Sequence, residues 1–426
     1  MHAAKFKVVA LQLYRLGVLA LIVWLIRDHH VRLRIAGDRP LAVDEVKSIF
    51  TNAASLRPDH SEREGMFVHD AEGNQLGYIV RTQPQCEHII GYCGLTDVLI
   101  FFDPSLMVLG LKVRSSEDTK THVADVVLDR RFPKKWNGMA WDDVAAMDLK
   151  KAGIEGVSGA TMTSMAMARS IVHRLRMANK ELQAHARPAA FRVRDYGLVA
   201  VIAAGCLFSF THLKGRRWMR RVFQVIVIGY VGFINGDLLA QSLLAGWAKS
   251  GVPWNLAPGL VLLVAASLLV PWATKKPLYC HQLCPHGAAQ EWLGRLGLKG
   301  KIHVPHRLGT GLQWLPGLSL GFVLLVVMLA APFDLADLEP FDAYIIRSAG
   351  WATIAVAIAG LVASLFIPQA YCRYGCPTGA LLEFVRSHGA HDCFGRRDVA
   401  AGLMVALVAL IWWKFPLINS WLLTAG

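Results

Sequence analysis

Four of the eight cysteines form two copies of one spacing, Cys280-x3-Cys284-Pro-x-Gly and Cys372-x3-Cys376-Pro-x-Gly. This spacing places both sulfurs of a motif on one side of a turn. Two motifs can therefore supply four thiolates to a single iron–sulfur cluster. A zinc ion held by the same four thiolates is the non-redox alternative. Two matched copies argue against cysteines that merely end helices. The spacing also differs from that of soluble bacterial ferredoxins, so any cluster must be assembled across helices.

The second candidate site is the run Ser158-Gly159-Ala160-Thr161, just before a helix predicted from Thr163 to about Gln183. Glycine lets the backbone approach a ligand closely. A helix N-terminus offers free amides and a positive dipole end to a phosphate, and the Thr161 hydroxyl can become the oxygen of a phosphate ester. The alternative is ordinary helix capping by Thr161, Thr163 or Ser164, which the spacing alone favours.

Long apolar stretches must position these residues. The chain has 426 residues, 54% of them hydrophobic and 18% charged, whereas soluble domains carry roughly a quarter charged residues. Seven stretches have the length that a bilayer requires. They cover about 8–26, 196–212, 222–247, 255–273, 313–332, 351–368 and 399–416. The first lacks a small-residue cleavage site and is predicted to be an uncleaved anchor. Each cysteine motif directly follows a span.

The charges predict the orientation of these spans. The net charge is +14, but the lysines and arginines lie beside apolar blocks, as the positive-inside rule expects. This placement predicts membrane topology and no nucleic-acid partner. The loops at 214–221, 275–307 and 373–397 are basic and predicted to be cytoplasmic, whereas 333–342 holds four acidic residues. The N-terminus and both cysteine motifs are then inside, and the polar segment 28–194 is outside.

One polar pair lies inside the third predicted span. A carboxylate in a bilayer is expensive and often functional, so Asp237, beside Asn235, could help to deprotonate a quinol. It could also pair with another helix, which we favour.

The predicted fold combines an α+β domain with an all-α membrane domain. Residues 1–27 form the anchor, 28–194 the outer domain, and 195–426 a polytopic domain of about six further helices. In the outer domain, composition predicts strands at 75–81, 96–103 and 106–114 and helices at 42–50, 139–148 and 163–183.

The stretch from Glu155 to Thr161 resembles the flavinylation motif of the FMN-binding domain family, which occurs in sodium-pumping quinone reductases, Rnf-type complexes and NosR-type proteins. In that family a flavin transferase joins the FMN phosphate to the last threonine of the motif, here Thr161. Thr163 and Ser164 are fallback acceptors. The family usually begins the motif with aspartate, whereas this chain has Glu155.

Upstream segments resemble the same family. Residues 89–94 are similar to its glycine-tyrosine-x-glycine segment, and 115–119 to its glutamate-threonine segment near the flavin ring. The resemblance implies that Glu117 and Thr119 contact the flavin ring or its ribityl chain, although both could also belong to a solvated turn. Cys86 and Cys93 can form a disulfide in an oxidising compartment, or Cys93 can be a small packed residue.

The cysteine motifs and their spans resemble the membrane part of NosR-type and PceC-like proteins, in which they bind a 4Fe-4S cluster. NosR proper usually carries a C-terminal ferredoxin module, which the sequence ending at Gly426 lacks. The resemblance implies an electron-transfer component of the inner membrane rather than a stand-alone enzyme. Electrons would pass between the quinone pool or a cytoplasmic donor and a periplasmic reductase, through covalent FMN. A redox-sensing regulatory or maturation protein is the alternative.

One physical difficulty follows from the predicted topology. The cysteine motifs and the FMN are expected on opposite faces of a hydrocarbon core about 30 Å thick. A quinone must bridge this gap, or a partner must supply a carrier, or the cluster must lie deeper than its loops suggest.

Overall fold

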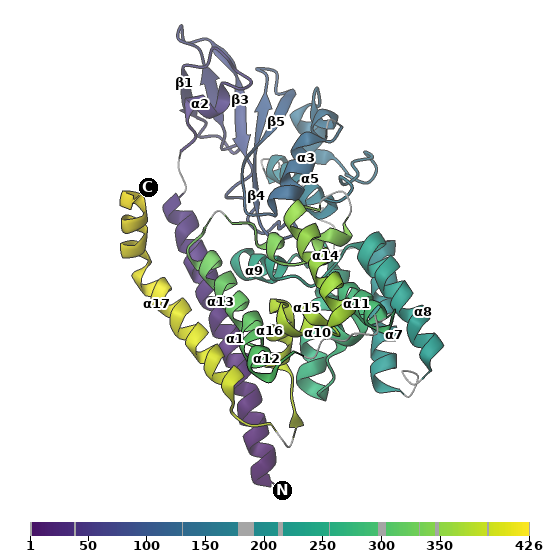
Figure 1. Cartoon of the computed structure of the whole chain (residues 1–426). Helices are drawn as coiled ribbons and strands as arrows, with labels where there is room; N and C mark the ends of the chain where they lie inside the picture. Colours follow the sequence, from purple (N-terminus) through teal and green to yellow (C-terminus); the bar gives the residue numbers. More distant parts are fainter. Residues whose placement is uncertain are drawn as a thin grey trace. The chain divides into compact units, whose positions relative to one another are not determined.

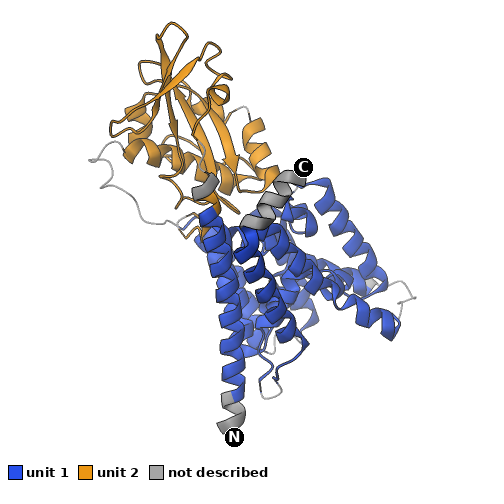
Figure 2. Ribbon diagram, turned by 90° about the vertical axis from the view of Figure 1, so that its left-hand side faces the viewer, with its two compact units in different colours: residues 1–32, 191–249, 257–426 blue, residues 33–190, 250–256 orange. Residues whose placement is uncertain are grey.

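The computed structural model describes residues 2–37, 40–129, 131–177, 191–211, 216–254, 256–296, 304–331, 333–345, 349–389 and 392–425. The chain divides into two compact units (Figure 2). Unit 1 comprises residues 1–32, 191–249 and 257–426, and unit 2 comprises residues 33–190 and 250–256. Each unit is therefore assembled from segments that are distant in the sequence.

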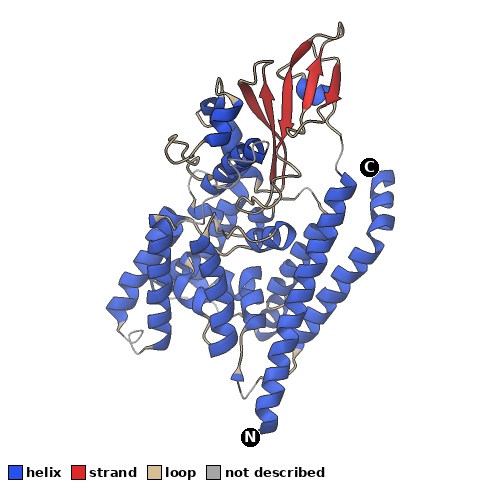
Figure 3. Cartoon of the chain, turned by 180° about the vertical axis from the view of Figure 1, so that it is seen from behind, coloured by secondary structure: helices blue, strands red, loops and turns tan. Residues whose placement is uncertain are grey.

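Unit 2 is built around one antiparallel sheet, drawn in red in Figure 3. Its five strands follow the order of the chain. The strands are β1 (Ser55–Pro58), β2 (Met66–His69), β3 (Gln75–Arg81), β4 (Thr96–Phe102) and β5 (Val108–Ser116). The helices of this unit are α2 (Val43–Val46), α3 (Lys120–Leu128), the 3-10 helix η1 (Pro133–Trp136), α4 (Trp141–Ala146) and α5 (Thr161–Met177). Because every strand pair is antiparallel, short connections suffice to join them.

Strand β4 lies at the centre of unit 2, because all seven of its residues are buried. Successive side chains of a strand point to opposite faces of the sheet. Val98 and Ile100 accordingly belong to the core that contains α4 and α5. Leu99 and Phe101 belong to a second core on the other face, with Val46 of α2. The sheet is thus covered on both faces. Helix α5, which packs in the first core, begins at the candidate residue Thr161.

The composition of residues 28–194 predicted the longer strands and the last helix of unit 2 closely. Strand β3 has the predicted bounds, β4 ends one residue early, and β5 is displaced by two residues. Helix α5 begins at Thr161, two residues before the predicted start, and the predicted end near Gln183 lies outside the described residues. The short strands β1 and β2 and the helix α3 were not predicted.

Unit 1 is helical (Figure 1). Its longer helices are α1 (His2–Gly37, which enters unit 2 at Leu33), α7 (Val193–Phe210), α8 (Arg217–Ile226), α10 (Pro258–Thr274), α11 (Pro285–Leu296), α13 (Leu315–Met328), α14 (Trp351–Phe366) and α17 (Arg396–Ala425). The shorter ones are the π-helices η3 (Val227–Asn235) and η4 (Tyr279–Leu283), α9 (Gln241–Ser250), α12 (His306–Leu312), η5 (Leu335–Leu338), η6 (Asp342–Tyr344), α15 (Ala370–Tyr374) and α16 (Pro377–Val385).

Four helical segments in the described part of the chain are long and apolar enough to cross a membrane. They are Lys7–Arg34, Val193–Phe210, His306–Met328 and Arg396–Phe415. Two further apolar helices, Pro258–Thr274 and Trp351–Phe366, are shorter. These six correspond to six of the seven predicted spans.

The remaining predicted span, 222–247, is wrong as a continuous helix. The chain there forms α8, η3 and α9, with a break at Gly236, whose φ is +73°. A left-handed residue ends a right-handed helix, and glycine adopts this conformation at little cost. Hydropathy follows the apolar character of the stretch and cannot detect such a break.

The polar pair at this break has the structural role that we favoured. Asn235 accepts a hydrogen bond from the guanidinium of Arg194, at the start of α7, at 3.2 Å. The side-chain amide of Asn235 in turn donates to Asp237, whose carboxylate lies 4.0 Å from Arg194. The pair therefore joins the broken segment to a neighbouring helix.

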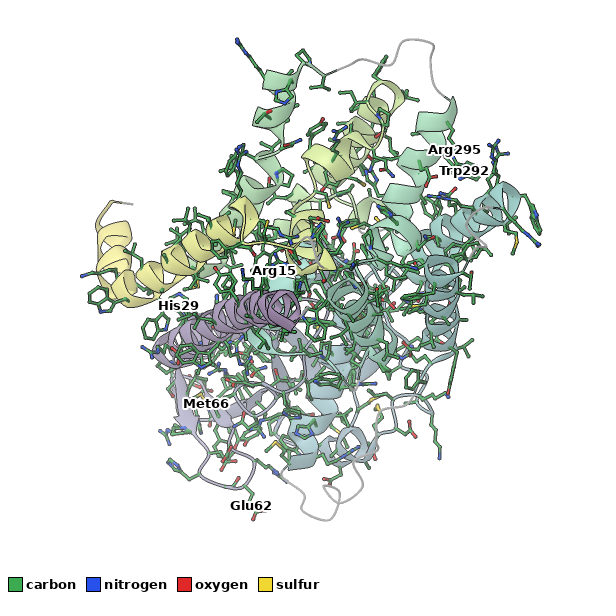
Figure 4. The ribbon with its side chains drawn as sticks, turned by 90° about the horizontal axis from the view of Figure 1, so that it is seen from below. Arg15, His29, Glu62, Met66, Trp292 and Arg295 are labelled. Carbon is green, nitrogen blue, oxygen red and sulfur yellow. The ribbon has the colours of Figure 1, made fainter. Side chains whose placement is uncertain are left out.

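A buried ion pair connects the first and last helices of unit 1. Arg15 on α1, labelled in Figure 4, is 0% exposed. Its Nε lies 2.8 Å from Asp398 Oδ1, and its Nη1 lies 2.9 Å from Asp392 Oδ2. Further along the helices, Asp28 accepts a hydrogen bond from Trp412. Arg15 contacts Asp398 and Asp28 contacts Trp412, so the residue numbers increase in the same direction along both helices, and α1 and α17 run parallel.

Candidate functional site

Each cysteine motif closes a turn and opens a helix. Cys284 follows η4 and directly precedes α11, while Cys376 is the N-cap of α16. The proline after each of these cysteines takes the first helical position, where a missing amide hydrogen costs nothing. The two motifs therefore have the same local geometry as well as the same spacing.

The glycine of each motif donates its backbone amide to the preceding sulfur. Gly287 N lies 3.4 Å from Cys284 Sγ, and Gly379 N lies 3.1 Å from Cys376 Sγ. A Cβ on Gly287 would approach the carbonyl oxygen of Cys280 to 3.0 Å, a tight contact that favours glycine there. Amide donors at helix N-termini stabilise negative charge, so these two bonds offset part of the charge that a thiolate would carry there.

All four motif cysteines line one cavity of about 880 Å³ inside unit 1. Its other walls are apolar side chains of α1, α9, α13 and α17, and four arginines also contribute to the lining: Arg373, Arg386, Arg396 and Arg397. The described residues contain no group of three or more histidine, cysteine or acidic side chains gathered closely enough to hold one metal ion. The cavity is thus a chamber that four cysteines share, with room for more than a single ion.

Burial shifts the ionisation of the groups around this chamber. It raises the pKa of the Cys280 thiol to about 12 and that of Cys372 to about 11. It lowers the pKa of His286 to about 4 and raises that of Glu339 to about 7. Burial therefore disfavours the thiolate form of Cys280 and Cys372, and a bound cation would favour it.

A buried carboxylate closes one side of the cysteine site. Glu339 is 1% exposed; it accepts a hydrogen bond from the hydroxyl of Thr378, which lies in the second motif, and another from the backbone amide of Gln241. Glu339 belongs to the acidic segment 333–342, which the charge pattern predicts on the face opposite to the motifs. The acidic segment and the second motif are therefore in contact, and their contact is buried inside unit 1.

Of the two histidines beside the first motif, one has a defined structural partner. His286 is 1% exposed, and its Nδ1 lies 3.2 Å from the hydroxyl of Tyr344 on η6. His281 lines the cavity. Tyr344, like Glu339, belongs to the segment that follows α13. Both cysteine motifs therefore contact this segment, the first through His286 and the second through Thr378.

One residue at this site carries no signal in the sequence. Gln290 on α11 is 0% exposed, and its side-chain amide nitrogen lies 3.2 Å from Cys372 Sγ. Its partner is 82 positions away along the chain. The first motif's helix therefore donates a hydrogen bond to the second motif's cysteine.

The run Ser158–Thr161 forms a tight turn that places Thr161 at the start of α5. The Ala160 amide donates to the carbonyl of Val157 at 3.0 Å, and Gly159 has a φ of +90°. A left-handed third residue is typical of a type II turn and favours glycine. Thr161 is half-buried and is the first residue of a 17-residue helix.

The hydroxyls of this segment do not have the contacts of helix caps. A cap oxygen accepts an amide hydrogen of the first helical turn. Thr161 Oγ1 instead donates to the Val157 carbonyl at 3.2 Å. Ser164 Oγ accepts from the Val157 amide, and Thr163 Oγ1 donates to Asp118. The capping alternative thus lacks the hydrogen bonds that define it.

Asp118 connects three segments of unit 2, and sequence reasoning missed it. Its carboxylate accepts hydrogen bonds from the amides of Tyr92 and Cys93 and from the hydroxyl of Thr163, at 2.7 to 3.0 Å. A Cβ on Gly91 would lie 2.2 Å from this carboxylate, so glycine is required. The glycine-rich segment 91–94, the segment 117–119 and the start of α5 are therefore brought together.

The predicted ring contacts on either side of Asp118 have other neighbours. Glu117 pairs with Arg34 at 2.6 Å and accepts a hydrogen bond from Ser250 at 2.9 Å. Thr119 lies beside Cys93, with 3.4 Å between its hydroxyl and the sulfur. Glu155 is exposed in the loop before the turn. Their roles toward a flavin stay predictions.

Cys86 and Cys93 are both buried, and neither forms a disulfide. Cys86 Sγ donates to the Ser170 carbonyl at 3.3 Å. Of the two alternatives, packing rather than a disulfide is the one that the structure has.

Two segments of the chain, 256–305 and 349–397, match the family described as "4Fe-4S binding domain". Each segment contains one cysteine motif. This family supports an iron–sulfur cluster in unit 1.

The chain is also similar to several known proteins. It is 34% identical over 188 residues to the "Regulatory protein NosR" of Pseudomonas aeruginosa, covering 40% of this chain and 24% of that protein. It is 31% identical to "Protein NirI" of Paracoccus denitrificans, over 41% of this chain and 25% of that protein. It is 32% identical to the "Putative electron transport protein YccM" of Escherichia coli, over 29% of this chain and 38% of that protein.

The chain thus spans about a quarter of the length of NosR and NirI in these matches. No solved structure matches it. The matched family and relatives agree with the paired cysteine motifs and the membrane-length helices. The chain is therefore related to the NosR-type membrane proteins and carries an iron–sulfur binding region.

Proposed function

We propose that this protein is a membrane electron-transfer flavoprotein. A 4Fe-4S cluster is held by Cys280, Cys284, Cys372 and Cys376, and FMN is attached covalently to Thr161. Electrons pass between quinol or a cytoplasmic donor and a periplasmic reductase. The observation that carries the proposal is the single chamber lined by all four motif cysteines, within the segments matched by the 4Fe-4S binding domain family.

The cysteine site fits a cluster by its donor chemistry. Four thiolates are the usual ligand set of a 4Fe-4S cluster, which supplies one-electron transfer when bound. The amides of Gly287 and Gly379 donate to two of these sulfurs. The chain's own part is to exclude water, to hold the sulfurs and to offset their charge.

The same chamber supports a quinol as electron donor. Its volume of about 880 Å³ is in the range of small-molecule sites, roughly 300–1,000 Å³. Its apolar walls come from helices of membrane length, including α1 and α17. Thr378 and Gln241 also line it, and both bond to Glu339 behind them. A quinol head would therefore find the cysteines together with Thr378 and Gln241, whose hydrogen bonds lead to the carboxylate of Glu339.

The Thr161 site supports a phosphate ester by its local geometry. The turn at Gly159 places a half-buried hydroxyl on the first residue of a long helix, where the backbone amides are unpaired. These amides and the helix dipole favour a phosphate. Flavin converts two-electron into one-electron traffic, and the protein holds it in place. We propose that Ser158, Gly159, Ala160 and Glu155 shape this site for a flavin transferase, with Glu117 and Thr119 near the ring.

The proposed setting is the inner membrane, with the N-terminus inside and the FMN domain in the periplasm. The basic loops and the membrane-length helices support it. A cluster inside the helical bundle, rather than at its surface, would shorten the distance that electrons must cover to reach the FMN. The contact of Thr378 with Glu339 supports this position.

Two measurements test the proposal. The full chain is produced together with a flavin transferase, purified, and digested for mass spectrometry. We expect an FMN-sized adduct on the peptide that contains Thr161, absent from Thr161→Ala. We also expect a soluble quinol analogue to bleach the flavin absorbance without oxygen. An unmodified Thr161 peptide would refute the flavin, and a flavin that no quinol reduces would refute quinol as the donor.

A regulatory or maturation role is the second candidate, because two relatives carry the name "Regulatory protein". If Thr161→Ala cells keep full activity of the partner reductase, a regulatory or structural role is favoured. If they lose it while the variant protein remains abundant, electron transfer is favoured.

A further inference from the structure

We propose that Gln290 sets the reduction potential of the cluster by donating a hydrogen bond to the thiolate of Cys372. This inference rests on the proposed cluster and adds a residue that no motif contains. It also implies that the two cysteine motifs, alike in sequence, are electrostatically unequal.

The amide of Gln290 is held in one orientation. Its oxygen accepts hydrogen bonds from Ser364 Oγ on α14 at 2.9 Å and from the Tyr371 amide on α15 at 3.2 Å. The same oxygen accepts from the backbone amide of Cys372 at 3.5 Å. A flipped amide would set its NH₂ group against the two backbone N–H donors of Tyr371 and Cys372, so these backbone amides assign the oxygen and nitrogen. The Ser364 hydroxyl, which also donates to the Gly360 carbonyl at 2.7 Å, could either donate or accept. The nitrogen therefore faces Cys372 Sγ, at 3.2 Å.

The two repeats differ at this position. Each residue of the first motif has its counterpart 92 positions later, so Cys280 corresponds to Cys372 and Cys284 to Cys376. The counterpart of Gln290 is Leu382 on α16, a buried side chain without donor atoms. The glycine amides bond to the second cysteine of both motifs, whereas the glutamine amide is present in only one repeat.

A donor at this place favours the reduced cluster. Reduction adds negative charge, part of which resides on the thiolates, and hydrogen bonds to the sulfurs are among the factors that set cluster potentials. Gln290 is 0% exposed, and in such surroundings a hydrogen bond is stronger than in water. The amide is neutral at every pH, so its effect does not depend on protonation.

The test compares reduction potentials of the full chain carrying its cluster, from titrations followed by electron paramagnetic resonance. Gln290→Met keeps the length of the side chain and removes the donor. We expect the reduced-to-oxidised ratio at a fixed potential to fall by up to about tenfold, because a hydrogen bond to a charged group contributes at least roughly that much in total and only the part that strengthens on reduction changes this ratio. For a one-electron couple, a tenfold fall in this ratio corresponds to a reduction potential that is about 59 mV more negative.

The matched control is Gln224→Leu. Gln224 on α8 is also buried, and its amide bonds to Glu291 and Trp292 rather than to a sulfur. We expect the control to keep the wild-type potential. An unchanged potential in Gln290→Met, or an equal shift in the control, would overturn the inference.

A second variant covers the case in which Gln290→Met fails to retain its cluster. Ser364→Ala keeps the donor but removes one of the three groups that contact the amide oxygen. We expect a smaller shift in the same direction, and the absence of any shift would refute the role of Gln290. If the wild-type protein itself binds no cluster, the proposed function fails, whereas a wild-type cluster with an unchanged potential in every variant contradicts only this inference.

Discussion

The two candidate sites are built in opposite ways. The cysteine site of unit 1 gathers residues from two motifs 92 positions apart, and its contacts include Gln290, Tyr344 and Glu339 from other segments. The turn at Thr161 in unit 2 is made within one short stretch, where Gly159 and the helix that follows are enough to present the hydroxyl. One site depends on the fold of a whole unit, whereas the other is a local turn that is connected to its unit by the packing of Ala160 and α5 and by the hydrogen bond of Thr163 to Asp118.

This difference determines how each site can be perturbed. A local turn survives most changes made elsewhere, because its geometry depends on neighbouring backbone dihedrals. A site assembled from distant segments loses its geometry when any one of them moves. We therefore expect independent behaviour of the two sites, and variants of single residues can test this.

The largest effect is expected for Cys372→Ser, which removes one of the four thiolates. We expect complete loss of bound iron and of cluster absorbance, while the Thr161 peptide keeps its FMN adduct. Iron analysis and mass spectrometry of the same sample measure both. Cys206→Ser is the control, since Cys206 on α7 is a free, half-exposed cysteine outside the motifs. Loss of the adduct together with the iron would contradict the independence of the sites.

An intermediate effect is expected for Asp118→Ala, which removes the connection between the Thr161 turn and its unit. The change leaves two buried amides and the Thr163 hydroxyl without their acceptor. Each unsatisfied group costs about 1–3 kcal/mol, so we expect the free energy of opening of unit 2 to fall by at least about 3 kcal/mol. Hydrogen exchange of peptides from β4 and β5 measures it.

The control for Asp118→Ala is Asp103→Ala, at the turn before β5, where a partly exposed carboxylate accepts two amide hydrogen bonds. We expect a loss below about 1 kcal/mol there, as for a solvated turn. Equal losses in the two variants would show that Asp118 is an ordinary turn residue.

The smallest effect on stability is expected for Glu155→Ala. Glu155 is exposed, so its removal should change the free energy of unfolding by less than about 0.5 kcal/mol. The rate of flavin attachment, followed by mass spectrometry over time, should nevertheless fall severalfold, and Glu155→Asp should restore it. If Glu155→Ala is modified at the wild-type rate, this carboxylate has no part in the modification.

The sequence predicted the local features well and the long-range contacts poorly. Strand β3 and the start of α5 are visible in residue patterns because they depend on side chains nearby. The break at Gly236 was missed, since hydropathy averages over a stretch and does not report one backbone dihedral. Gln290 was missed because its partner lies on another helix. Asp118 lies between Glu117 and Thr119, which were predicted as ring contacts. Its role in joining three segments was missed because its hydrogen-bond partners are distant in the sequence.

The buried pair of Arg15 with Asp392 and Asp398 has a consequence for biosynthesis. The arginine is made first, and its two acidic partners follow 377 and 383 residues later. At a synthesis rate of about 5–20 residues per second, the wait is roughly 20–80 s. During this time a helix of membrane length carries an unpaired cation, which is costly to place in lipid. The first helix can therefore reach its final position only after the last one arrives, and a ribosome that stops early leaves a chain whose anchor is never neutralised.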